Sequence, residues 1–371
     1  MKIPLSNPDI TELEKKYVLE VLNSSHLSLG PKLPEFEEKL AQYVGAKYAV
    51  AVNSGTSALH CCIKALGIGD EDLVITTPFS FVSSANCILF ERATPVFVDI
   101  DKSTYNIDAA KIEEAIKKLG PRASRLKAIL PVHVFGQPCE MNTIIDIAGK
   151  YNLKVIEDAC EALGAQFNGK KVGAYGDCGV FAFYPNKQMT TGEGGIVITN
   201  NESIALQCRS LRNQGRDDDN AWLAHARLGY NYRLSDINCA LGLAQMERID
   251  EILEKRARVA AMYNQRLKDV EGIRAPFVSE NIKMSWFVYV VRLDEKYNRE
   301  DRDRILQGLR EKGIGCNNYF VPIHLQPFYM EMFGHKKGDF PITEYTAERT
   351  IALPFYNNLK EDEVEYEYVA V

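Results

Sequence analysis

The sequence predicts an α/β protein with a mostly parallel sheet covered by helices on both faces, and a smaller second domain. Two observations lead to this prediction. Short apolar runs alternate with helical segments between residues 48 and 157, which is typical of a parallel sheet. The chain also has 371 residues, more than the ~250–300 that a single hydrophobic core usually serves. A hydrophobic fraction of 46% and a charged fraction of 25% are those of an ordinary globular protein.

Two amphipathic helical segments, 11–23 and 33–43, open the chain and are separated by the turn signal Ser-Leu-Gly-Pro. The alternating region follows them. Its predicted strands are 48–52, 73–77, 95–98, 128–132 and 154–157, and its predicted helices end near residue 66 or cover 80–90, 109–118 and 141–151. Ligands collect at the carboxyl ends of the strands in such a sheet, so residues that directly follow a strand are the first candidates for a site.

Later segments extend the sheet and predict the second domain. Strands at 180–183 and 196–199 flank a glycine-rich loop, and a helix from about Ser235 runs towards Leu267 with a break. Beyond it we expect a strand at 286–293, a helix at 299–312, a strand near 316–320 and a terminal helix from Glu361. We therefore place a large domain at 1–250 and a small domain at 251–371, with the N-terminal helix as a candidate to pack on the small domain.

Charge and cysteine usage limit the classes of partner. The net charge of -6 and the pI near 5.7 argue against nucleic acid or an anionic membrane as the main partner. Nine cysteines without a Cys-x-x-Cys pair fit a reducing cytoplasm better than disulfides or a zinc site. No run of about 18 apolar residues occurs. We therefore expect a soluble cytoplasmic protein with no membrane segment and no metal site.

Lys187 stands in the glycine-rich loop between two apolar strands. Burying an unpaired ammonium is costly, so a lysine enclosed there usually has a chemical task, most often a covalent bond to an aldehyde. A surface lysine in a hairpin loop is the better interpretation of this stretch taken alone. The upstream residues change that balance.

The segment Asn53-Ser54-Gly55-Thr56-Ser57 joins a strand to the start of a helix. Backbone N–H groups, hydroxyls and the positive helix end meet there and suit an anion, ideally a phosphate. Capping of the helix by Thr56 or Ser57 explains the same pattern equally well.

Asp158 directly follows the strand Lys-Val-Ile-Glu. A carboxylate at a strand end can hold a pyridine nitrogen protonated through a charge-assisted hydrogen bond, which makes the ring a strong electron sink. Taken alone, Asp158 reads better as a helix cap. Together with Lys187 and the possible phosphate site, it favours a site for a pyridoxal cofactor.

Several segments, in order and at matching spacing, carry a family resemblance: Gly30-Pro31 with Phe36-Glu37, Ser54-Gly55-Thr56-Ser57-Ala58-Leu59, Pro78-Phe79-Ser80-Phe81-Val82, Pro95-Val96-Phe97-Val98-Asp99, Glu157-Asp158-Ala159-Cys160-Glu161-Ala162, Lys187 with Thr191-Gly192-Glu193-Gly194-Gly195, and Gly229-Tyr230-Asn231-Tyr232-Arg233-Leu234-Ser235. Over nearly its whole length the chain resembles the DegT/StrS-type nucleotide-sugar aminotransferases, a branch of the fold-type I pyridoxal-phosphate (PLP) enzymes.

The resemblance implies a fold and a cofactor. The fold would be that of a fold-type I PLP-dependent transferase, with a mostly parallel seven-stranded sheet between helices and a smaller α+β C-terminal domain. Lys187 would form the Schiff base with PLP and move protons afterwards, Asp158 would pair with the pyridine nitrogen, and Phe81 would stack on the ring. Phe81 is equally plausible as a core aromatic when read from the residues alone.

The resemblance also implies a shared active site. Gly55, Thr56 and Ser57 would hold the phosphate within one chain, and Asn231 would reach the phosphate of the neighbouring subunit's cofactor. The enzyme would then be an obligate homodimer. Without the resemblance, Asn231 reads as a turn residue.

Two positions depart from the commonest form of the family. Many relatives carry Gln at the position of Glu161, near the phenolic oxygen of the cofactor; a carboxylate there would favour a protonated Schiff base or be protonated itself. Ala182 replaces a serine that often contacts the phosphate. Binding of the phosphate would therefore depend more on Thr56, Ser57 and Asn231. Lys187 argues against the dehydratases of the family, which carry His at that position.

The function implied is an aminotransferase that uses L-glutamate as donor and a keto sugar linked to a nucleoside diphosphate as acceptor, at C4 of a 6-deoxy hexose. A 3-keto sugar or a cyclitol as acceptor is the alternative within enzymes. A non-catalytic regulator on the same fold is a second class, which retention of Lys187 and Asp158 disfavours. A nucleotide-binding loop at Gly192-Glu193-Gly194-Gly195 is a weak third, because no Lys-Ser/Thr follows.

Three residues are candidates for substrate contacts. His324 lies in Val-Pro-Ile-His-Leu-Gln-Pro, which matches a family segment that borders the sugar site, and Tyr319 precedes it closely. Arg233 is a candidate for a diphosphate or dimer contact. A structural role is equally plausible for His324, and a surface salt bridge for Arg233.

Overall fold

A seven-stranded sheet lies at the centre of the protein, with the strand order β1-β9-β8-β5-β4-β2-β3. The structure is a computed structural model that describes residues 1–217 and 224–370. Strand β9 pairs antiparallel with β1 and β8, whereas the pairs from β8 to β3 are parallel, which confirms the predicted mostly parallel sheet. The strands are β1 (Tyr48–Val52), β2 (Leu73–Thr76), β3 (Thr94–Phe97), β4 (Leu126–Ile129), β5 (Lys154–Asp158), β8 (Cys178–Ala182) and β9 (Gly195–Thr199).

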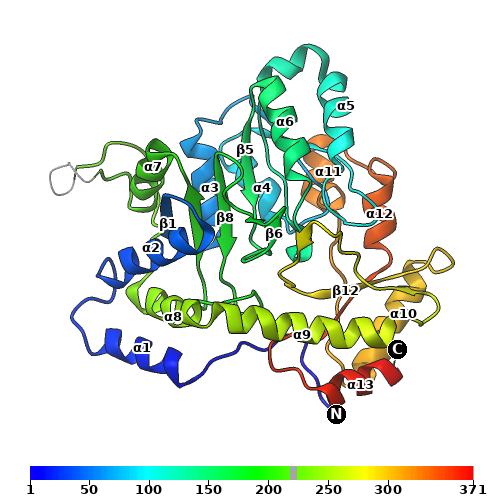
Figure 1. Cartoon of the computed structure of the whole chain (residues 1–371). Helices are drawn as coiled ribbons and strands as arrows, with labels where there is room; N and C mark the ends of the chain where they lie inside the picture. The colour runs from blue at the N-terminus through cyan, green and yellow to red at the C-terminus, as the bar shows by residue number, and fades with distance from the viewer. Residues whose placement is uncertain (218–223, 371) are drawn as a thin grey trace.

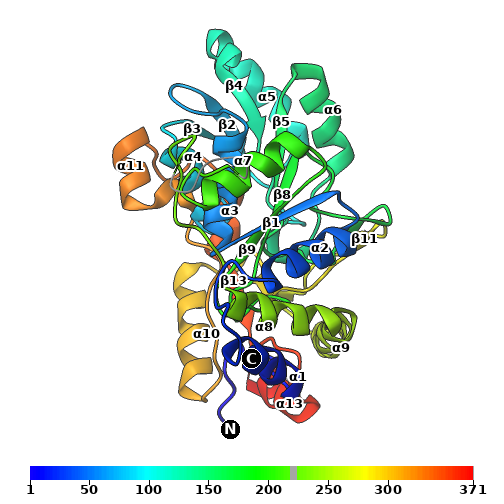
Figure 2. The ribbon, with the colours of Figure 1, turned by 90° about the vertical axis from the view of Figure 1, so that its left-hand side faces the viewer.

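Helices cover both faces of this sheet (Figure 2). The strands are therefore apolar on both sides, and every residue of β2 is buried. One face packs against α2 (Lys32–Val44), α5 (Ala109–Leu119), α6 (Met141–Tyr151) and α8 (Asp236–Glu247), and the other against α3 (Gly55–Ala65), α4 (Ser83–Phe90) and α7 (Glu202–Arg212). Short 3-10 turns lie at Gly120–Arg125, Val134–Gly136 and Ile323–Leu325.

Side-chain caps begin many of these helices where the sequence places Ser, Asp or Asn. Ser54 accepts a hydrogen bond from the N–H of Ser57 at the start of α3. At the start of α8, the side chain of Ser235 accepts a hydrogen bond from the N–H of Asn238. Helix α2 ends at Gly45, whose φ of 83° is left-handed and suits glycine. The break predicted in the long helix is confirmed, because α8 ends at Glu247 and α9 (Ile249–Leu267) begins after Arg248.

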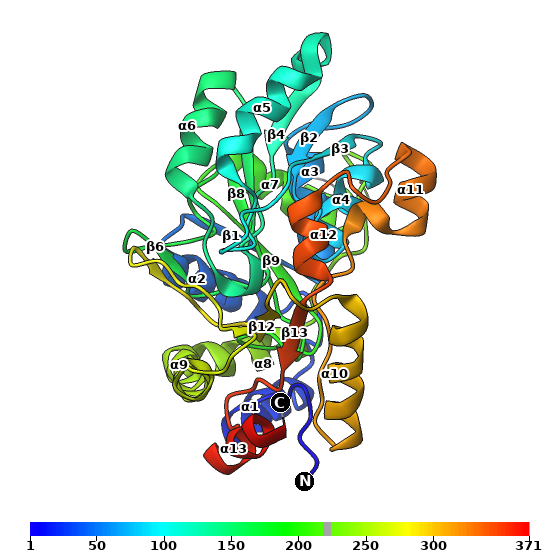
Figure 3. The ribbon, with the colours of Figure 1, turned by 90° about the vertical axis from the view of Figure 1, so that its right-hand side faces the viewer.

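The small domain has its own core between helices and a three-stranded sheet (Figure 3). The sheet order is β10-β12-β13. Its elements are β10 (Ile273–Arg274), β12 (Tyr289–Leu293), β13 (Thr350–Leu353), α10 (Arg299–Glu311), α13 (Glu361–Ala370) and the connecting helix α9. The predicted boundary after residue 250 falls in the first turn of α9.

The prediction of a strand near 316–320 is wrong. That segment forms only an isolated bridge between Asn317 and Ala352, and the third strand of the small sheet is β13. Two consecutive asparagines interrupt the apolar run at 317–318, whereas all of β13 is buried. Sequence reasoning missed β13 because four apolar or hydroxyl residues form too short a run to stand out.

Segments from each half of the chain pack on the other half. Residues 1–5 attach to the small domain, where Ile3 N–H donates to Gly313 O at 3.0 Å. Helix α1 (Glu12–Leu22) packs along α8 of the large domain, which corrects the expectation that the N-terminal helix packs on the small domain. Conversely, α11 (Pro327–Phe333) and α12 (Pro341–Ala347) return to the large domain beside α4 and β3 (Figures 1 and 3). Strand β11 (Ile282–Lys283) pairs with β6 (Gln166–Phe167), which pairs with β7 (Lys170–Lys171).

The nine cysteines are free thiols, and all but the half-buried Cys160 are buried. Burial raises the pKa of thiols such as Cys62 and Cys208 well above the ordinary value. Among the described residues, none of the helices combines the length and the apolar character that crossing a membrane requires.

Candidate active site

A cavity of about 520 Å³ opens at the carboxyl ends of the parallel strands. This is where a sheet of this kind is expected to bind ligands. Strand ends, helix starts and a small-domain segment all contribute to its wall. The lining residues are Ser54, Gly55, Thr56, Leu59, Ser80, Phe81, Ser83, Ser84, Val132, Asp158, Cys160, Glu161, Ala182, Tyr184, Asn186, Lys187, Glu193, Gly194, Phe287, Tyr319 and Phe320.

Lys187 enters this cavity from the loop between β8 and β9. Its side chain is 14% exposed, and its Nζ lies 3.6 Å from Oε1 of Glu161 and 3.9 Å from the ring centroid of Phe287. The next residue fixes the loop, because Gln188 Nε2 donates to the carbonyl of Glu161 at 2.5 Å and to Ser285 Oγ at 2.9 Å. The lysine is therefore enclosed, whereas the sequence of this stretch taken alone favoured a surface lysine.

Asp158 ends β5 and is 5% exposed. Its Oδ2 accepts a hydrogen bond from Ser84 Oγ at 2.6 Å, and its Oδ1 accepts one from the N–H of Cys160 at 3.2 Å. Both carboxylate oxygens are thereby oriented. Ser84 was missed by sequence reasoning, and no pattern in Phe-Val-Ser-Ser distinguishes a serine that turns towards Asp158 from one that faces elsewhere.

Glu161 is a second buried carboxyl group in the cavity. Its Oε2 accepts a hydrogen bond from the N–H of Phe135 at 2.8 Å. Burial raises the pKa of Glu161 above its ordinary value, and the nearby charge of Lys187 opposes that shift without cancelling it. Loss of charge at Glu161 is therefore easier than for a carboxyl group in water.

The start of helix α3 forms another part of the cavity wall. Gly55 and Thr56 line it, and the N–H groups of a first helical turn have no partner within their own helix. A Cβ built on Gly55 would lie 2.7 Å from Cβ of Ala182 and 3.0 Å from Sγ of Cys160. Only glycine allows this helix start to approach β8 so closely, which leaves a backbone cradle suited to an anion.

Aromatic side chains form the remaining wall. Phe81 is 62% exposed beside the cavity, which excludes its alternative interpretation as a core aromatic. Tyr319 and Phe320 approach from the small domain, and burial raises the pKa of Tyr319 to about 12, so that it stays a neutral phenol. Of the three predicted substrate residues, Tyr319 is the one that lines the cavity.

The other predicted residues lie elsewhere. The Ser57 hydroxyl donates to Asn53 Oδ1 at 2.7 Å, and Ser57 is absent from the lining. His324 is fully buried and its Nε2 lies 3.0 Å from Oε1 of Glu344, outside the cavity. Arg233 donates to Asn213 Oδ1 at 3.2 Å. Asn231 is exposed on its own chain and also lies outside the lining.

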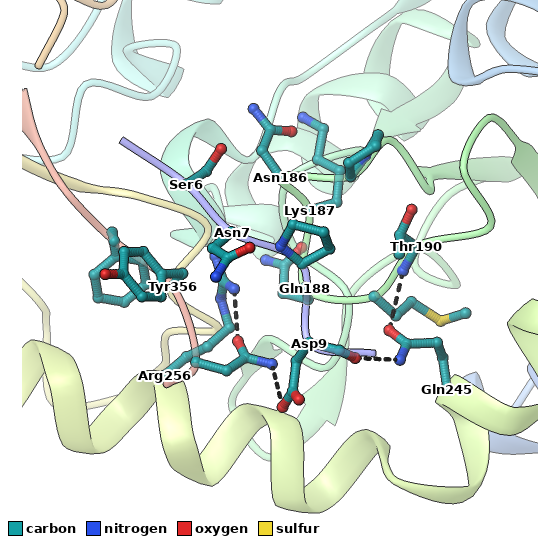
Figure 4. A pocket seen from close by; sticks show the side chains of 15 residues that line it. Ser6, Asn7, Asp9, Asn186, Lys187, Gln188, Thr190, Gln245, Arg256 and Tyr356 are labelled. Atoms are coloured by element: carbon teal, nitrogen blue, oxygen red, sulfur yellow. Dashed lines mark hydrogen bonds between the residues drawn. The ribbon is translucent and has the colours of Figure 1, made fainter. Parts of the chain in front are cut away.

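A second, much smaller cavity lies behind Lys187 (Figure 4). It is bounded by the N-terminal segment from Ser6 to Asp9, the lysine loop and Arg256 of α9. Its volume of about 10 Å³ is room for roughly one water molecule, so it cannot admit a substrate. Within the described part of the chain, no cluster of His, Cys, Asp and Glu could hold a metal ion.

The large cavity fits a phosphorylated pyridine aldehyde. It offers an enclosed amine for the aldehyde at Lys187, an oriented carboxylate for the pyridine nitrogen at Asp158, and a glycine cradle at a helix start for the phosphate at Gly55. A mostly parallel seven-stranded sheet with such a lysine at its carboxyl edge, and a small C-terminal domain beside it, defines the fold-type I transferases.

Comparison with known proteins agrees with this class. The profile of the DegT/DnrJ/EryC1/StrS aminotransferase family matches residues 8–370. GDP-perosamine synthase of Caulobacter vibrioides is 39% identical over 98% of this chain and 96% of its own. The structure of PseC of Helicobacter pylori, an aminotransferase involved in the biosynthesis of pseudoaminic acid, superposes with a TM-score of 0.91 at 31% identity, over 100% of this chain and 98% of that one.

A further structural relative was solved with its cofactor. Spr1654 of Streptococcus pneumoniae, a proposed sugar aminotransferase, superposes in its PLP-form with a TM-score of 0.93 at 28% identity, over 100% of this chain and 97% of that one. The chain belongs to the DegT/DnrJ/EryC1/StrS aminotransferase family and is an aminotransferase with the fold-type I architecture.

Proposed function

We propose that this aminotransferase binds PLP on Lys187 and transfers the amino group of L-glutamate to a keto sugar linked to a nucleoside diphosphate, at C4 of a 6-deoxy hexose. One observation carries the proposal: a single cavity combines an enclosed amine, an oriented carboxylate and a helix start suited to phosphate. The nucleotide-sugar part is supported by the relative named GDP-perosamine synthase, which matches nearly the full length.

The residues present would hold PLP at three points. Lys187 Nζ would bond the aldehyde carbon, Asp158 would pair with the pyridine N–H, and the N–H groups of Gly55 and Thr56 would bind the phosphate. Phe81 would cover one face of the ring. Bound PLP supplies the electron sink that stabilises negative charge on the carbon that loses a proton.

Lys187, once the amino group of the donor has replaced its Nζ on the aldehyde carbon, would act as the acid and base of both half-reactions. Its Nζ would take a proton from the amino-bearing carbon of the donor and later return one to the carbon of the sugar acceptor. Glu161, 3.6 Å from Nζ, and the ring of Phe287 hold the amine at one place while it changes protonation. Tyr319 and Phe320 would exclude water from the reacting carbon and face the sugar.

We also propose a homodimer in which Asn231 completes the partner's phosphate site. Asn231 is exposed, and its backbone is anchored because Asn53 N–H donates to Tyr232 O at 2.9 Å and Gln214 N–H donates to Tyr230 O at 2.8 Å. Leu228, which precedes Asn231 closely in the chain, is 77% exposed and is an apolar side chain that a second subunit would cover. Arg233 remains our candidate for a diphosphate contact.

The experiment is a panel of enzymatically made nucleoside-diphosphate keto sugars incubated with the purified enzyme and L-glutamate, with products identified by mass spectrometry. We expect amination of a 4-keto-6-deoxy hexose, and none with Lys187→Ala. Turnover of only 3-keto sugars or cyclitols would replace the acceptor we propose. A colourless protein that aminates no acceptor after addition of PLP would favour the alternative function, a non-catalytic regulator on the same fold.

A further inference from the structure

The hydroxyl group of Ser57 is occupied by hydrogen bonds to its neighbours at the start of helix α3. It donates to Asn53 Oδ1 at 2.7 Å and lies 2.9 Å from Ser54 Oγ, which in turn accepts from the N–H of Ser57 at 3.1 Å. Ser57 is 7% exposed and does not line the cavity. Binding a phosphate with this hydroxyl would require it to give up its hydrogen bond to Asn53 Oδ1, which contributes about 1 kcal/mol.

The wall beside Gly55 also lacks a hydroxyl. Ala182 lines the cavity there with a methyl group, and a Cβ on Gly55 would approach that methyl to 2.7 Å. The sequence predicted that Thr56 and Ser57 would offer hydroxyl groups to the phosphate. Of these two residues, Thr56 is the one that lines the cavity. A phosphate dianion needs several donors acting together, because the end of one helix contributes only about 0.3–1 kcal/mol.

Ser83 supplies a hydroxyl at this place. It is the first residue of α4, and its Oγ lies 2.7 Å from Oγ1 of Thr56, with both residues lining the cavity. The two hydroxyls carry two hydrogens and use one between them, so at least one is available to an anion. Helix α4 has no side-chain cap, so the cap does not occupy the hydroxyl of Ser83.

We propose that Ser83 is a binding residue for the cofactor phosphate, in place of the hydroxyl that Ala182 lacks and of Ser57, whose hydroxyl is bonded to Asn53. The inference rests on the proposed function. The first turn of α4 then serves both ends of the cofactor: Ser83 faces Thr56 at the phosphate end, and Ser84 donates to Asp158 at the pyridine end.

The test compares PLP with pyridoxal, which lacks the phosphate, on cofactor-free enzyme. Both ligands can bond Lys187, so the ratio of their dissociation constants reports the phosphate contacts alone. We expect Ser83→Ala to weaken PLP binding about tenfold or more, as expected for a hydrogen bond to a charged group, and to leave pyridoxal binding within about twofold. Inorganic phosphate should raise the melting temperature of the cofactor-free wild type more than that of Ser83→Ala.

Two further variants sharpen the test. Ser83→Ala combined with Ala182→Ser should recover most of the lost PLP affinity, because the second change returns a hydroxyl to the same end of the cavity. Ser57→Ala is the matched control: it should lower the melting temperature through the lost hydrogen bond to Asn53 Oδ1 and leave the ratio of PLP to pyridoxal affinity unchanged. Ser83→Thr, which keeps a hydroxyl, should bind PLP like the wild type.

The outcomes separate the two proposals. A wild type that binds PLP no more tightly than pyridoxal would contradict the phosphate site and with it the proposed function. PLP binding that prefers the phosphate in the wild type and equally in Ser83→Ala would overturn the role of Ser83 alone. A loss of that preference in Ser57→Ala would return the role to Ser57.

Discussion

Asp158 owes its position to two donors, Ser84 and the N–H of Cys160, one on each carboxylate oxygen. We expect Asp158→Asn to keep PLP bound but to slow both half-reactions about a hundredfold or more, on the order of 3 kcal/mol of barrier. The amide has the same shape and no charge to keep the pyridine nitrogen protonated. Stopped-flow absorbance with L-glutamate alone measures the first half-reaction, and near-normal rates would reduce Asp158 to a structural residue.

Lys187 is the residue on which we expect the cofactor to be covalently held, because its amine is the one that the cavity encloses. Reduction of the holoenzyme with borohydride and peptide mapping should place the pyridoxyl group on Lys187. Lys171 and Lys64, which are half-buried and do not line the cavity, are internal controls and should stay unlabelled. A label on another lysine would refute the assignment.

Some features of single residues in the site could be predicted from the sequence, and others could not. Lys187, Asp158, Gly55 and Thr56 were predictable because each directly follows or links a strand in a recognisable pattern. The direction of a hydroxyl was not. Ser57 and Ser83 occupy similar places in the sequence, at helix starts, and only the neighbouring Asn53 and Thr56 decide which hydroxyl turns inwards.

Helix α9 carries a buried arginine that binds acceptors of the small domain and lines the small cavity behind Lys187. Arg256 donates to the carbonyls of Trp286 and Phe287 at 2.7 and 2.6 Å and to Asn357 Oδ1 at 2.8 Å, and burial lowers its pKa to about 9. We expect Arg256→Ala to cost about 2–4 kcal/mol, because these buried acceptors lose their donor. Urea unfolding measures the loss.

A matched control lies two residues further along α9. Arg258 is exposed and makes one long hydrogen bond of 3.4 Å to the carbonyl of Asn357. Arg258→Ala should change the free energy of unfolding by less than about 1 kcal/mol. Equal losses in the free energy of unfolding for the two variants would mean that α9 tolerates neither truncation. The buried hydrogen bonds of Arg256 would then contribute no more to stability than the contact of Arg258.

Helix α13 places a carboxyl group in the core of the small domain. Glu367 is 1% exposed, and burial raises its pKa from 4.5 to about 8. Between these values the unfolded chain has lost the proton that the folded chain keeps, so the contribution of Glu367 to stability is present below pH 4.5 and is lost as the pH rises through about 8. Unfolding of the wild type and Glu367→Gln from pH 5 to 8 measures this.

The glutamine variant keeps an acceptor for the hydroxyl of Tyr263, to which Glu367 is hydrogen-bonded, and cannot ionise. We therefore expect its stability to fall less with rising pH than that of the wild type, with the two closest at pH 5. Parallel curves would show that Glu367 ionises in the folded protein as it does in the unfolded chain.

At the scale of the whole molecule, two domains were predictable from length and from the change in pattern after residue 250. The packing of segments from each domain on the other domain was not predictable from the sequence. Residues 1–5 pair with the small domain, and α11 and α12 return to the large one, through contacts such as Ile323 N–H to Pro78 O at 2.8 Å. Contacts between residues so distant in sequence leave no periodic signal, because each segment shows only that it has a buried face.

The last prediction concerns the proposed dimer and its shared sites. Lys187→Ala removes the amine from one chain, and Asn231→Asp sets a carboxylate against the neighbour's phosphate, where like charges repel. Each variant alone should be nearly inactive. After unfolding and reassembly at equal amounts, half the dimers should be mixed, and a two-fold interface gives each mixed dimer one site with both defects and one with neither. Activity should then recover to about a quarter of the wild type by this symmetry count. If Asn231 served its own chain, every site would still carry a defect, so an absence of recovery with subunit exchange confirmed by mass would exclude the shared site.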